Sequence, residues 1–275
     1  MCIRDRSSAF ITTKPIIDNS DPFAALAFRF FFVAVGFLLF SLYSKYSIII
    51  KRKNLIESVL SGILFHGLYL GGVFYSISIG MPTSIAALIV TLQPILTNIL
   101  SGPILNEKVT LKQWIGVLLG FLGATLVLGL DLGSKIPLLG LVATLIALIS
   151  ITASTIWQKK LSNNLPLSVS NFYQAVGGCF FHILVVIFFA KPYIAFTKTF
   201  LLSMGHQIFL VSFGAFTILM FLIKKNSASK TVSIFFLIPA TSALMAWFFL
   251  KESLTAIDLL GFLITSIGVY IATRD

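Results

Sequence analysis

A few polar side chains stand inside the long apolar stretches of this sequence, and their chemistry suits the binding of a ligand. Arg29 carries a guanidinium, His66 carries an imidazole with Tyr69 nearly one helical turn further on, and Gln93 carries an amide directly before Pro94. A guanidinium binds anionic groups, an imidazole takes up or releases a proton near neutral pH, and an amide both donates and accepts hydrogen bonds. These groups are suited to reversible binding rather than to breaking a covalent bond.

Motifs for catalysis are missing from the sequence. It contains no CxxC or HExxH spacing for a metal and no glycine-rich P-loop for ATP. Asp and Glu do not occur well inside an apolar stretch, since Glu57 and Asp258 lie at the ends, so the sequence offers no carboxylate proton relay. We therefore predict a protein that is not an enzyme and that binds neither a metal nor another cofactor.

The composition places the chain in a lipid environment. Of its 275 residues, 57% are hydrophobic and 11% are charged, and the mean hydropathy is +1.01. A soluble domain carries about 25% charged residues, so this chain has too few to cover a surface that faces water. The net charge of +11 does not indicate nucleic-acid binding, because the basic residues stand in short connections between apolar runs.

The elements that must position the polar side chains are nine apolar runs, most of them about 20 residues long, as a bilayer-spanning helix requires. The predicted fold class is therefore all-α, a polytopic membrane protein. The predicted spans cover residues 22–43, 56–79, 83–105, 114–130, 138–157, 167–189, 200–223, 231–250 and 257–272.

The start of the chain does not form a complete span of its own. Residues 1–6 read as a charged, non-native leader, and residues 7–14 read as the end of a helix whose first part is missing. Counting this remnant as helix 1, the sequence predicts a ten-helix architecture with about nine complete spans.

The distribution of basic residues predicts the orientation, because Lys and Arg are enriched in cytoplasmic connections. If both termini of the full-length protein are cytoplasmic, more of them lie inside than outside. We therefore predict a multi-pass protein of the cell (inner or plasma) membrane. The inside connections hold Lys45, Lys51, Arg52, Lys53, Lys108, Lys112, Lys159, Lys160, Lys224, Lys225, Lys230 and Arg274, and the outside ones hold Lys14, Lys135, Lys191, Lys198 and Lys251.

The chain contains an internal repeat, with five unusual positions recurring at one spacing. The predicted units cover residues 7–135 and 136–275, each with five helices. Because five is an odd number, the second unit enters the membrane from the opposite side, and such inverted repeats are typical of secondary transporters. Pro94, Glu107, Thr110, Gly116 and Gly123 recur 145 residues later as Pro239, Glu252, Thr255, Gly261 and Gly268.

These residues carry a resemblance to a known family. The pattern from Gly80 to Pro94, the Leu-Asn-Glu ending at Glu107 and the glycines that follow resemble the EamA module of the drug/metabolite transporter superfamily, and the second half resembles the same module again. Arg29 also fits the pattern. The resemblance implies ten helices, two EamA repeats, and export or exchange of small metabolites.

Several roles follow for the polar residues. Pro94 and Pro239 are predicted to kink their helices near a midplane site. Gln93 binds either a substrate or a neighbouring helix, and His66 either lines the pathway or links helices. Arg29 faces a cavity, makes a structural hydrogen bond, or extends outward to the nearby interface. The predicted substrate pathway comprises Arg29, His66, Tyr69, Gln93, Thr97, Tyr173 and Gln174.

The remaining conspicuous residues are predicted to be structural or peripheral. Glu107 and Glu252 are expected to cap the helix that follows each of them, and His182 is expected to be a core residue. His206 and Gln207 are expected to lie at the outer membrane interface. The glycines expected to allow close helix packing are Gly116, Gly123, Gly261 and Gly268.

The function predicted from these features is secondary transport of a small molecule, such as an amino acid or a drug-like compound, by alternating access. A passive channel or a non-transporting membrane scaffold is the alternative. A channel is expected to show a selectivity motif or charged rings, and we find neither in the sequence. The predicted partners are the small-molecule substrate and the lipid bilayer, with no nucleic acid.

Overall fold

The computed structural model describes residues 12–128, 136–161, 165–189, 192–239, 241 and 255–274, and within these ranges every regular element is a helix. The prediction of an all-α polytopic membrane protein is therefore confirmed. The helices of the first half are α2 (Pro22–Tyr43), α3 (Arg52–Gly62), η1 (Ile63–Tyr69), α4 (Leu70–Ser78), α5 (Thr83–Val90), α6 (Gln93–Leu105) and α7 (Leu111–Leu128). Those of the second half are α8 (Leu138–Leu161), α9 (Leu167–Phe189), α10 (Lys198–His206), η2 (Gln207–Ala215), α11 (Phe216–Lys225), α12 (Ala228–Ser233), η3 (Ile234–Phe236) and α14 (Ala256–Thr273).

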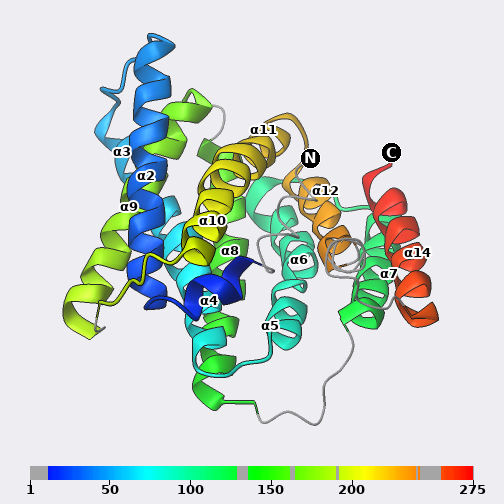
Figure 1. Ribbon diagram of the computed structural model, residues 1–275. Helices are drawn as coiled ribbons and strands as arrows, with labels where there is room; N and C mark the ends of the chain where they lie inside the picture. The colour runs from blue at the N-terminus through cyan, green and yellow to red at the C-terminus, as the bar shows by residue number, and fades with distance from the viewer. Residues whose placement is uncertain are drawn as a thin grey trace.

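Eight continuous helical segments in the described part of the chain are long and apolar enough to cross a membrane (Figure 1). Three of them, Pro22–Tyr43, Thr83–Leu105 and Leu167–Phe189, begin and end at the residues that the sequence predicts. Of the predicted span 231–250, the structure describes a shorter apolar helix, Ala228–Pro239, and most of the rest lies outside the described residues. Of the predicted remnant of helix 1, residues 7–14, the structure describes residues 12–14, which belong to a helical stretch over residues 12–17.

Local side-chain caps explain where several helices begin. Asp21 accepts hydrogen bonds from the backbone N–H groups of Phe23 at 3.0 Å and Ala24 at 2.8 Å, which satisfies the first turn of α2. At α14, Thr255 and Asp258 form a reciprocal capping box. These capping residues therefore fix where α2 and α14 begin.

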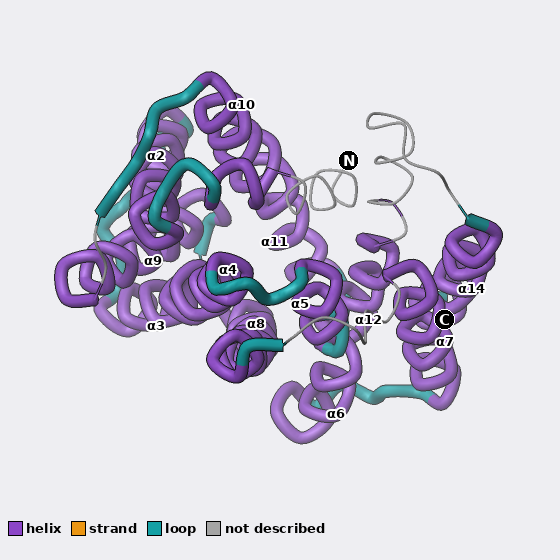
Figure 2. The backbone as a smooth tube through the Cα atoms, turned by 60° about the horizontal axis from the view of Figure 1, so that its bottom comes forward, coloured by secondary structure: helices purple, strands orange, loops and turns teal. Residues whose placement is uncertain are grey.

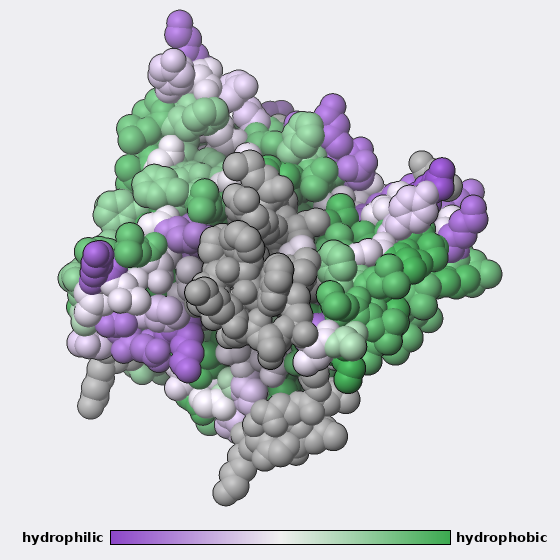
Figure 3. Space-filling model, turned by 45° about the vertical axis from the view of Figure 1, so that its right-hand side comes forward, coloured by the Kyte–Doolittle hydropathy of each residue, from purple (hydrophilic) through white to green (hydrophobic). Residues whose placement is uncertain are grey.

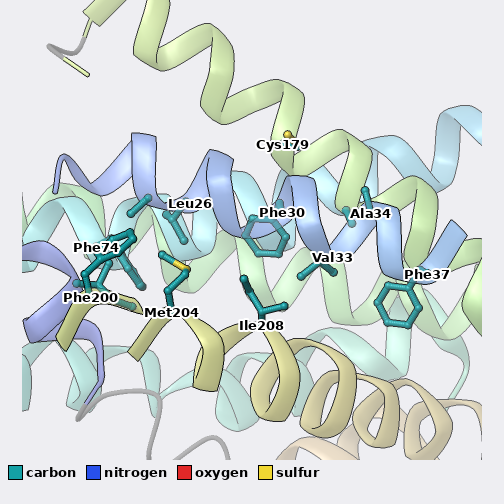
Figure 4. Close-up of a cluster of buried hydrophobic side chains, with 13 residues drawn as sticks. Leu26, Phe30, Val33, Ala34, Phe37, Phe74, Cys179, Phe200, Met204 and Ile208 are labelled. Carbon is teal, nitrogen blue, oxygen red and sulfur yellow. The ribbon is translucent and has the colours of Figure 1, made fainter. Parts of the chain in front are cut away.

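The largest buried apolar cluster lies where α2 packs against α4, α9, α10 and η2 (Figure 4). Leu26, Phe30 and Val33 project from α2 toward Met204 and Ile208 on α10 and η2, and all five side chains are buried. The buried face of α2 is apolar apart from Arg29 and Ser41, and the packing leaves Phe31 and Leu39 on the other side exposed.

Two helices from opposite halves, α7 and α14, lie side by side at one edge of the molecule (Figures 1 and 2). A Cβ atom added at Gly116 would lie 2.4 Å from the backbone nitrogen of Ala272, and one added at Gly123 would lie 2.6 Å from the carbonyl oxygen of Gly261. Only glycine permits two backbones to approach this closely. Gly268 meets Gly116 in the same way, so the glycine pairs cross between the two halves.

In the view of Figure 3, large hydrophobic areas lie on the outer surface on either side of the grey residues. Phe31 and Leu39 on α2, Phe188 on α9 and Leu263 on α14 are each more than half exposed. Exposed apolar area on this scale would make a soluble monomer aggregate, whereas hydrocarbon chains solvate it. The chain is thus a multi-pass membrane protein.

Several helices are interrupted near mid-depth. α5 ends at Val90 and α6 begins at Gln93, so the span breaks in the turn before Pro94. In the second half, the 3₁₀ turn η3 precedes Pro239 in the same way. Proline has no N–H to donate and clashes with the preceding turn, which accounts for both breaks. Two further spans contain wider π-helical segments, η1 and η2.

Candidate functional site

Two adjoining cavities lie between the interrupted helices. The first cavity has a volume of about 80 Å³ and the second of about 260 Å³, and Tyr69 and Ile238 belong to the walls of both. The first cavity is lined by Thr13, Arg29, Phe65, His66, Tyr69, Leu70, Val73, Phe74, Gln207, Val211, Ser212, Phe216 and Ile238. The second is lined by Tyr69, Thr83, Ser84, Ala87, Val90, Thr91, Gln93, Leu128, Ile151, Phe235, Ile238 and Pro239.

Arg29 points into the protein and forms part of the wall of the first cavity. Its side chain is 4% exposed, so the alternative in which it extends outward to the interface is wrong. Nε and Nη2 each donate to the Ser212 hydroxyl at 3.0 Å, and Nη1 donates to the Gln207 side-chain oxygen. Ser212 and Gln207 are both on η2, and they hold the guanidinium in place.

Gln207 belongs to the same polar group, which corrects its predicted place at the membrane interface. It is 1% exposed, and its amide nitrogen donates to the hydroxyls of Thr12 at 3.2 Å and Thr13 at 3.3 Å. The sequence places the start of this span too late. α10 begins at Lys198, so Gln207 lies about 14 Å along the span at about 1.5 Å per residue. Gln207 therefore lies more than two helical turns inside the span Lys198–Lys225.

His66 lies on the π-helical segment η1, at the junction of the two halves. Its ring stands 4.4 Å from Phe30 and 4.7 Å from Phe216, measured between ring centroids. Its backbone carbonyl is 2.9 Å from Nε2 of His182, which is fully buried on α9. His182 is a core residue as expected, and this contact gives it a polar partner that the sequence does not reveal. His66 therefore lines the first cavity and also helps to hold α9 against η1.

The second cavity follows the break between α5 and α6. Gln93 is 1% exposed, and its amide nitrogen donates to the Thr155 hydroxyl on α8 at 2.9 Å. Gln93 thus lines a cavity and binds a neighbouring helix at the same time. Pro239 lines the same cavity from the second half. The structure therefore brings Tyr69, Gln93 and Pro239 around one space.

Three predicted pathway residues do not line either of these cavities. Tyr173 donates its hydroxyl to the carbonyl of Ile48 at 2.7 Å, near one end of α9. Gln174 exchanges hydrogen bonds with Gln158 on α8. Thr97 is fully buried on α6, one turn beyond Gln93. The sequence identifies these side chains as polar and intramembrane, but it does not show that they lie away from both cavities.

Glu107 caps a helix, although not the one that follows it. One carboxylate oxygen accepts from the backbone N–H of Ala228 at 2.9 Å and the other accepts from that of Ser229 at 3.4 Å, at the start of α12 in the other half. The start of α7 is instead capped by Thr110 and Gln113, which bond each other's backbone N–H groups. The predicted local cap is therefore wrong for Glu107, while Glu252 lies outside the described residues.

The turn at Asn106 directs the Glu107 side chain toward the start of α12. Asn106 ends α6 in the left-handed conformation, with φ of 55°, which asparagine tolerates better than most residues. Next to the Glu107 contact, the Ser229 hydroxyl hydrogen-bonds the side-chain oxygen of Asn98 on α6. We call the contacts of Glu107 and Asn98 with the start of α12 the α12 clasp.

The matching helix start in the first half has no such contact. At the offset of 145, Ala228 corresponds to Thr83 and Ser229 to Ser84. α5 begins there with Pro82 at its N-cap position and no side-chain cap, and both Thr83 and Ser84 line the second cavity. The two halves therefore differ in structure at positions that match in sequence.

Among the described residues, no group of three His, Cys, Asp or Glu side chains is placed to hold a metal ion. The arrangement instead has one guanidinium, a few neutral hydrogen-bonding groups and many apolar and aromatic walls. Sites with this make-up bind small organic molecules non-covalently.

Comparison with known families identifies the chain. The model of the EamA-like transporter family matches residues 7–129 and again residues 138–274. The chain belongs to the EamA-like transporter family. It is thus a membrane transporter by family, and the two relatives described next are named as a transporter and as an efflux pump.

Family members similar to this chain come from several bacteria. The uncharacterized transporter YvbV of Bacillus subtilis is 28% identical over 76% of this chain and 68% of its own length. A probable amino-acid metabolite efflux pump of Escherichia coli is 23% identical over 95% of this chain and 89% of its own length. A solved crystal structure that is 16% identical superposes with a TM-score of 0.82, covering 99% of this chain and 94% of that one, which shows the shared fold.

Proposed function

We propose that this EamA family member is a secondary transporter that moves a small metabolite across the cell membrane by alternating access between two inverted five-helix repeats. The observation that carries the proposal is the structural difference between α5 and α12. α12 is held at its first turn by Glu107, whereas the first turn of α5 lines a cavity. Two similar halves in different conformations are what alternating access requires, because exchanging their conformations opens the site to the opposite side.

A layer of hydrogen bonds between the halves supports closure at one end of the site. The Gln158 amide donates to the Ser61 hydroxyl at 2.9 Å, and Ser154 donates to the Ser61 carbonyl at 3.1 Å. Ser61 and Gln158 lie nearer to Arg52 and Leu161, the ends of their helices, than the cavity residues on the same helices do. In the orientation that we predict from the charge distribution, this end is cytoplasmic. The α12 clasp lies at the same end.

At the opposite end, the second cavity reaches Thr83, Ser84 and Leu128, which lie at the ends of their spans. The proposed state is therefore closed toward the cytoplasm, with the site extending toward the outer ends of α5 and α7. Both termini of the full-length protein are cytoplasmic in this proposal. The Escherichia coli relative named for amino-acid metabolite efflux supports amino-acid metabolites as the first substrates to test.

The test is exchange in proteoliposomes that contain the purified protein. We expect uptake of a labelled amino-acid metabolite to saturate and to accelerate when the vesicles are preloaded with unlabelled compound. Saturable exchange that is stimulated by substrate on the opposite side requires a carrier whose binding site reorients across the membrane with substrate bound. Flux that rises linearly with concentration and ignores the internal compound would instead indicate a channel, and no flux across a broad metabolite panel would favour a scaffold.

A further inference from the structure

A third cavity lies apart from the two that form the candidate site, where the end of α2, the start of α9 and the end of α11 meet. Its volume is about 800 Å³, and it shares no lining residue with the other two. Figure 1 shows these three helix ends on the same side of the molecule. In the orientation that we predict from the charge distribution, this side is cytoplasmic. We call this cavity the α2–α11 groove, and its walls include Phe37, Phe213, Phe221, Ser168, Lys224 and Lys225.

Much of the wall of the groove is apolar. Phe37 is buried, and Phe213 packs so closely on α2 that a Cβ atom added at Gly36 would clash with its ring. Phe40 and Phe221 also line the groove, and both are exposed, so the groove reaches the surface of the molecule. An acyl chain that lies against these walls stays in apolar surroundings along its length.

Basic side chains stand where α11 ends. Lys224 and Lys225 are the last two residues of α11, and both line the groove. Nζ of Lys225 lies 5.9 Å from the centroid of the Phe221 ring, so the basic group adjoins an apolar wall. The described residues that line the groove include no Asp or Glu. Two ammonium groups beside apolar walls complement a molecule with an anionic head group and a hydrocarbon tail.

Two hydroxyl groups in the groove supply an independent indication of a ligand. Ser168, in the first turn of α9, is 7% exposed, and its hydroxyl makes no hydrogen bond within the described part of the chain. The same holds for the hydroxyl of Thr217 on α11, which lies about 10 Å along the helix before Lys224. A buried hydroxyl without a partner is unfavourable, and a phosphate or ester oxygen in the groove would accept a hydrogen bond from each. The start of α9 adds a partial positive charge beside Ser168, which favours an anion there.

We propose that the α2–α11 groove binds an anionic phospholipid from the membrane leaflet at this end of the protein. The phosphate lies between Lys224, Lys225 and the Ser168 hydroxyl, and an acyl chain follows the phenylalanine walls. The Thr217 hydroxyl donates to an ester carbonyl deeper in the groove. The lysines attract the anionic head group to this leaflet. The site goes beyond the proposed function, because α2 belongs to the first half and α9 and α11 to the second, so the bound lipid contacts both halves.

Native mass spectrometry of the purified full chain in detergent tests the site. The probes are phosphatidylglycerol and phosphatidylcholine with the same acyl chains, which share the phosphate and differ in net charge. Inorganic phosphate is the third probe, because it offers the anion without the chains. We expect one phosphatidylglycerol to bind at least about tenfold more tightly than phosphatidylcholine. Inorganic phosphate in large excess does not displace it, because phosphate buries no apolar area.

Variants of the groove assign the binding to its residues. Lys224→Gln combined with Lys225→Gln lowers the affinity for phosphatidylglycerol at least about tenfold and leaves that for phosphatidylcholine within about twofold. Arginine at both positions keeps the charges and keeps the affinity, whereas Ser168→Ala lowers it severalfold. The matched control is Lys108→Gln combined with Lys112→Gln, which leaves the affinity unchanged. It removes two exposed lysines on the same proposed cytoplasmic side, next to α7, at the opposite edge of the molecule from α2 and α9 (Figures 1 and 2).

The inference is overturned if phosphatidylcholine binds as tightly as phosphatidylglycerol, or if the control variant loses as much affinity as the Lys224 and Lys225 variant. Displacement of the lipid by inorganic phosphate would make the groove a site for a free anion, which also overturns it. A dimer of the chain that persists when lipid is added and is lost in the Lys224 and Lys225 variant would assign the groove to a second copy instead. The measurement involves no transport, so its result is independent of the proposed function.

Discussion

Removing the Glu107 carboxylate is expected to open the cytoplasmic end of the protein. Glu107 binds two backbone N–H groups at the first turn of α12 and adds a negative charge there. Ser227 remains the N-cap of α12 through its bond from the Lys230 N–H, so the variant loses one further side-chain acceptor at the helix start, which costs about 0.5–1.5 kcal/mol, and a negative charge there worth about 0.3–1 kcal/mol. Glu107→Ala therefore destabilises the clasped state by about 1–2 kcal/mol, and the open population rises about 5- to 30-fold.

A cysteine introduced at a buried position can report the opening of the cytoplasmic end. Thr97 is fully buried one residue before Asn98, and no hydrogen bond holds its hydroxyl, so Thr97→Cys introduces a thiol at little cost. With Cys2 and Cys179 replaced by serine, maleimide labelling from the cytoplasmic side is measured in inside-out vesicles. Because labelling follows the open population when opening is fast, we expect the rate to rise about 5- to 30-fold in Glu107→Ala.

Two further variants separate the clasp from general loosening. Glu107→Gln keeps an acceptor oxygen and loses the charge, so its labelling rate should fall between wild type and Glu107→Ala. Glu57 on α3 lies at the same proposed cytoplasmic end as Glu107, and it makes no described hydrogen bond to α12. Glu57→Gln should therefore leave the labelling rate unchanged. Equal rates in Glu107→Ala and its parent would refute the reasoning, as would equal acceleration by Glu57→Gln.

The proposed topology predicts that a cysteine at Lys51 reacts with impermeant reagents only from the cytoplasm and one at Lys198 only from outside; labelling of both from one side contradicts it. Gly116→Ala places a Cβ 2.4 Å from a backbone nitrogen of α14 and should cost about 1–3 kcal/mol, seen as a lower thermal midpoint. Gly205→Ala, where a Cβ meets nothing within 4 Å, is its control, and equal midpoints would refute the glycine packing. Gln93→Ala should slow substrate exchange at least tenfold, about 1.4 kcal/mol, at near-normal yield; lower yield with normal exchange per molecule would make Gln93 purely structural.

The sequence predicts the helices well because of the solvent in which they lie. In hydrocarbon each span satisfies its own backbone hydrogen bonds, so the length and hydropathy of a run decide where a helix forms. The spans Pro22–Tyr43 and Leu167–Phe189 agree with prediction to the residue. Other starts are predicted a few residues late because polar first turns hide them: the predicted span 200–223 begins at Lys198, and the predicted span 56–79 begins at Arg52.

The candidate site is only partly readable from the sequence. Polar residues in apolar runs and the repeated prolines identify Arg29, His66 and Gln93, all of which line a cavity. The same criterion also selects Gln174, which binds another helix instead. Ser212 carries no signal, because a serine in a membrane helix is common and its partner lies 183 positions away in the chain.

By itself, therefore, the sequence determined that the chain spans a membrane, where its apolar helices lie in the described part of the chain, and that it has two related halves. These properties follow from local hydropathy and from comparing the chain with itself. Only the tertiary structure decided which face of each helix turns toward which neighbour. In it, Arg29 hydrogen-bonds Gln207 and Ser212, and Glu107 accepts from the start of α12 rather than from that of α7. Such contacts depend on the rotation and depth of packed helices, which a pattern along one helix does not encode.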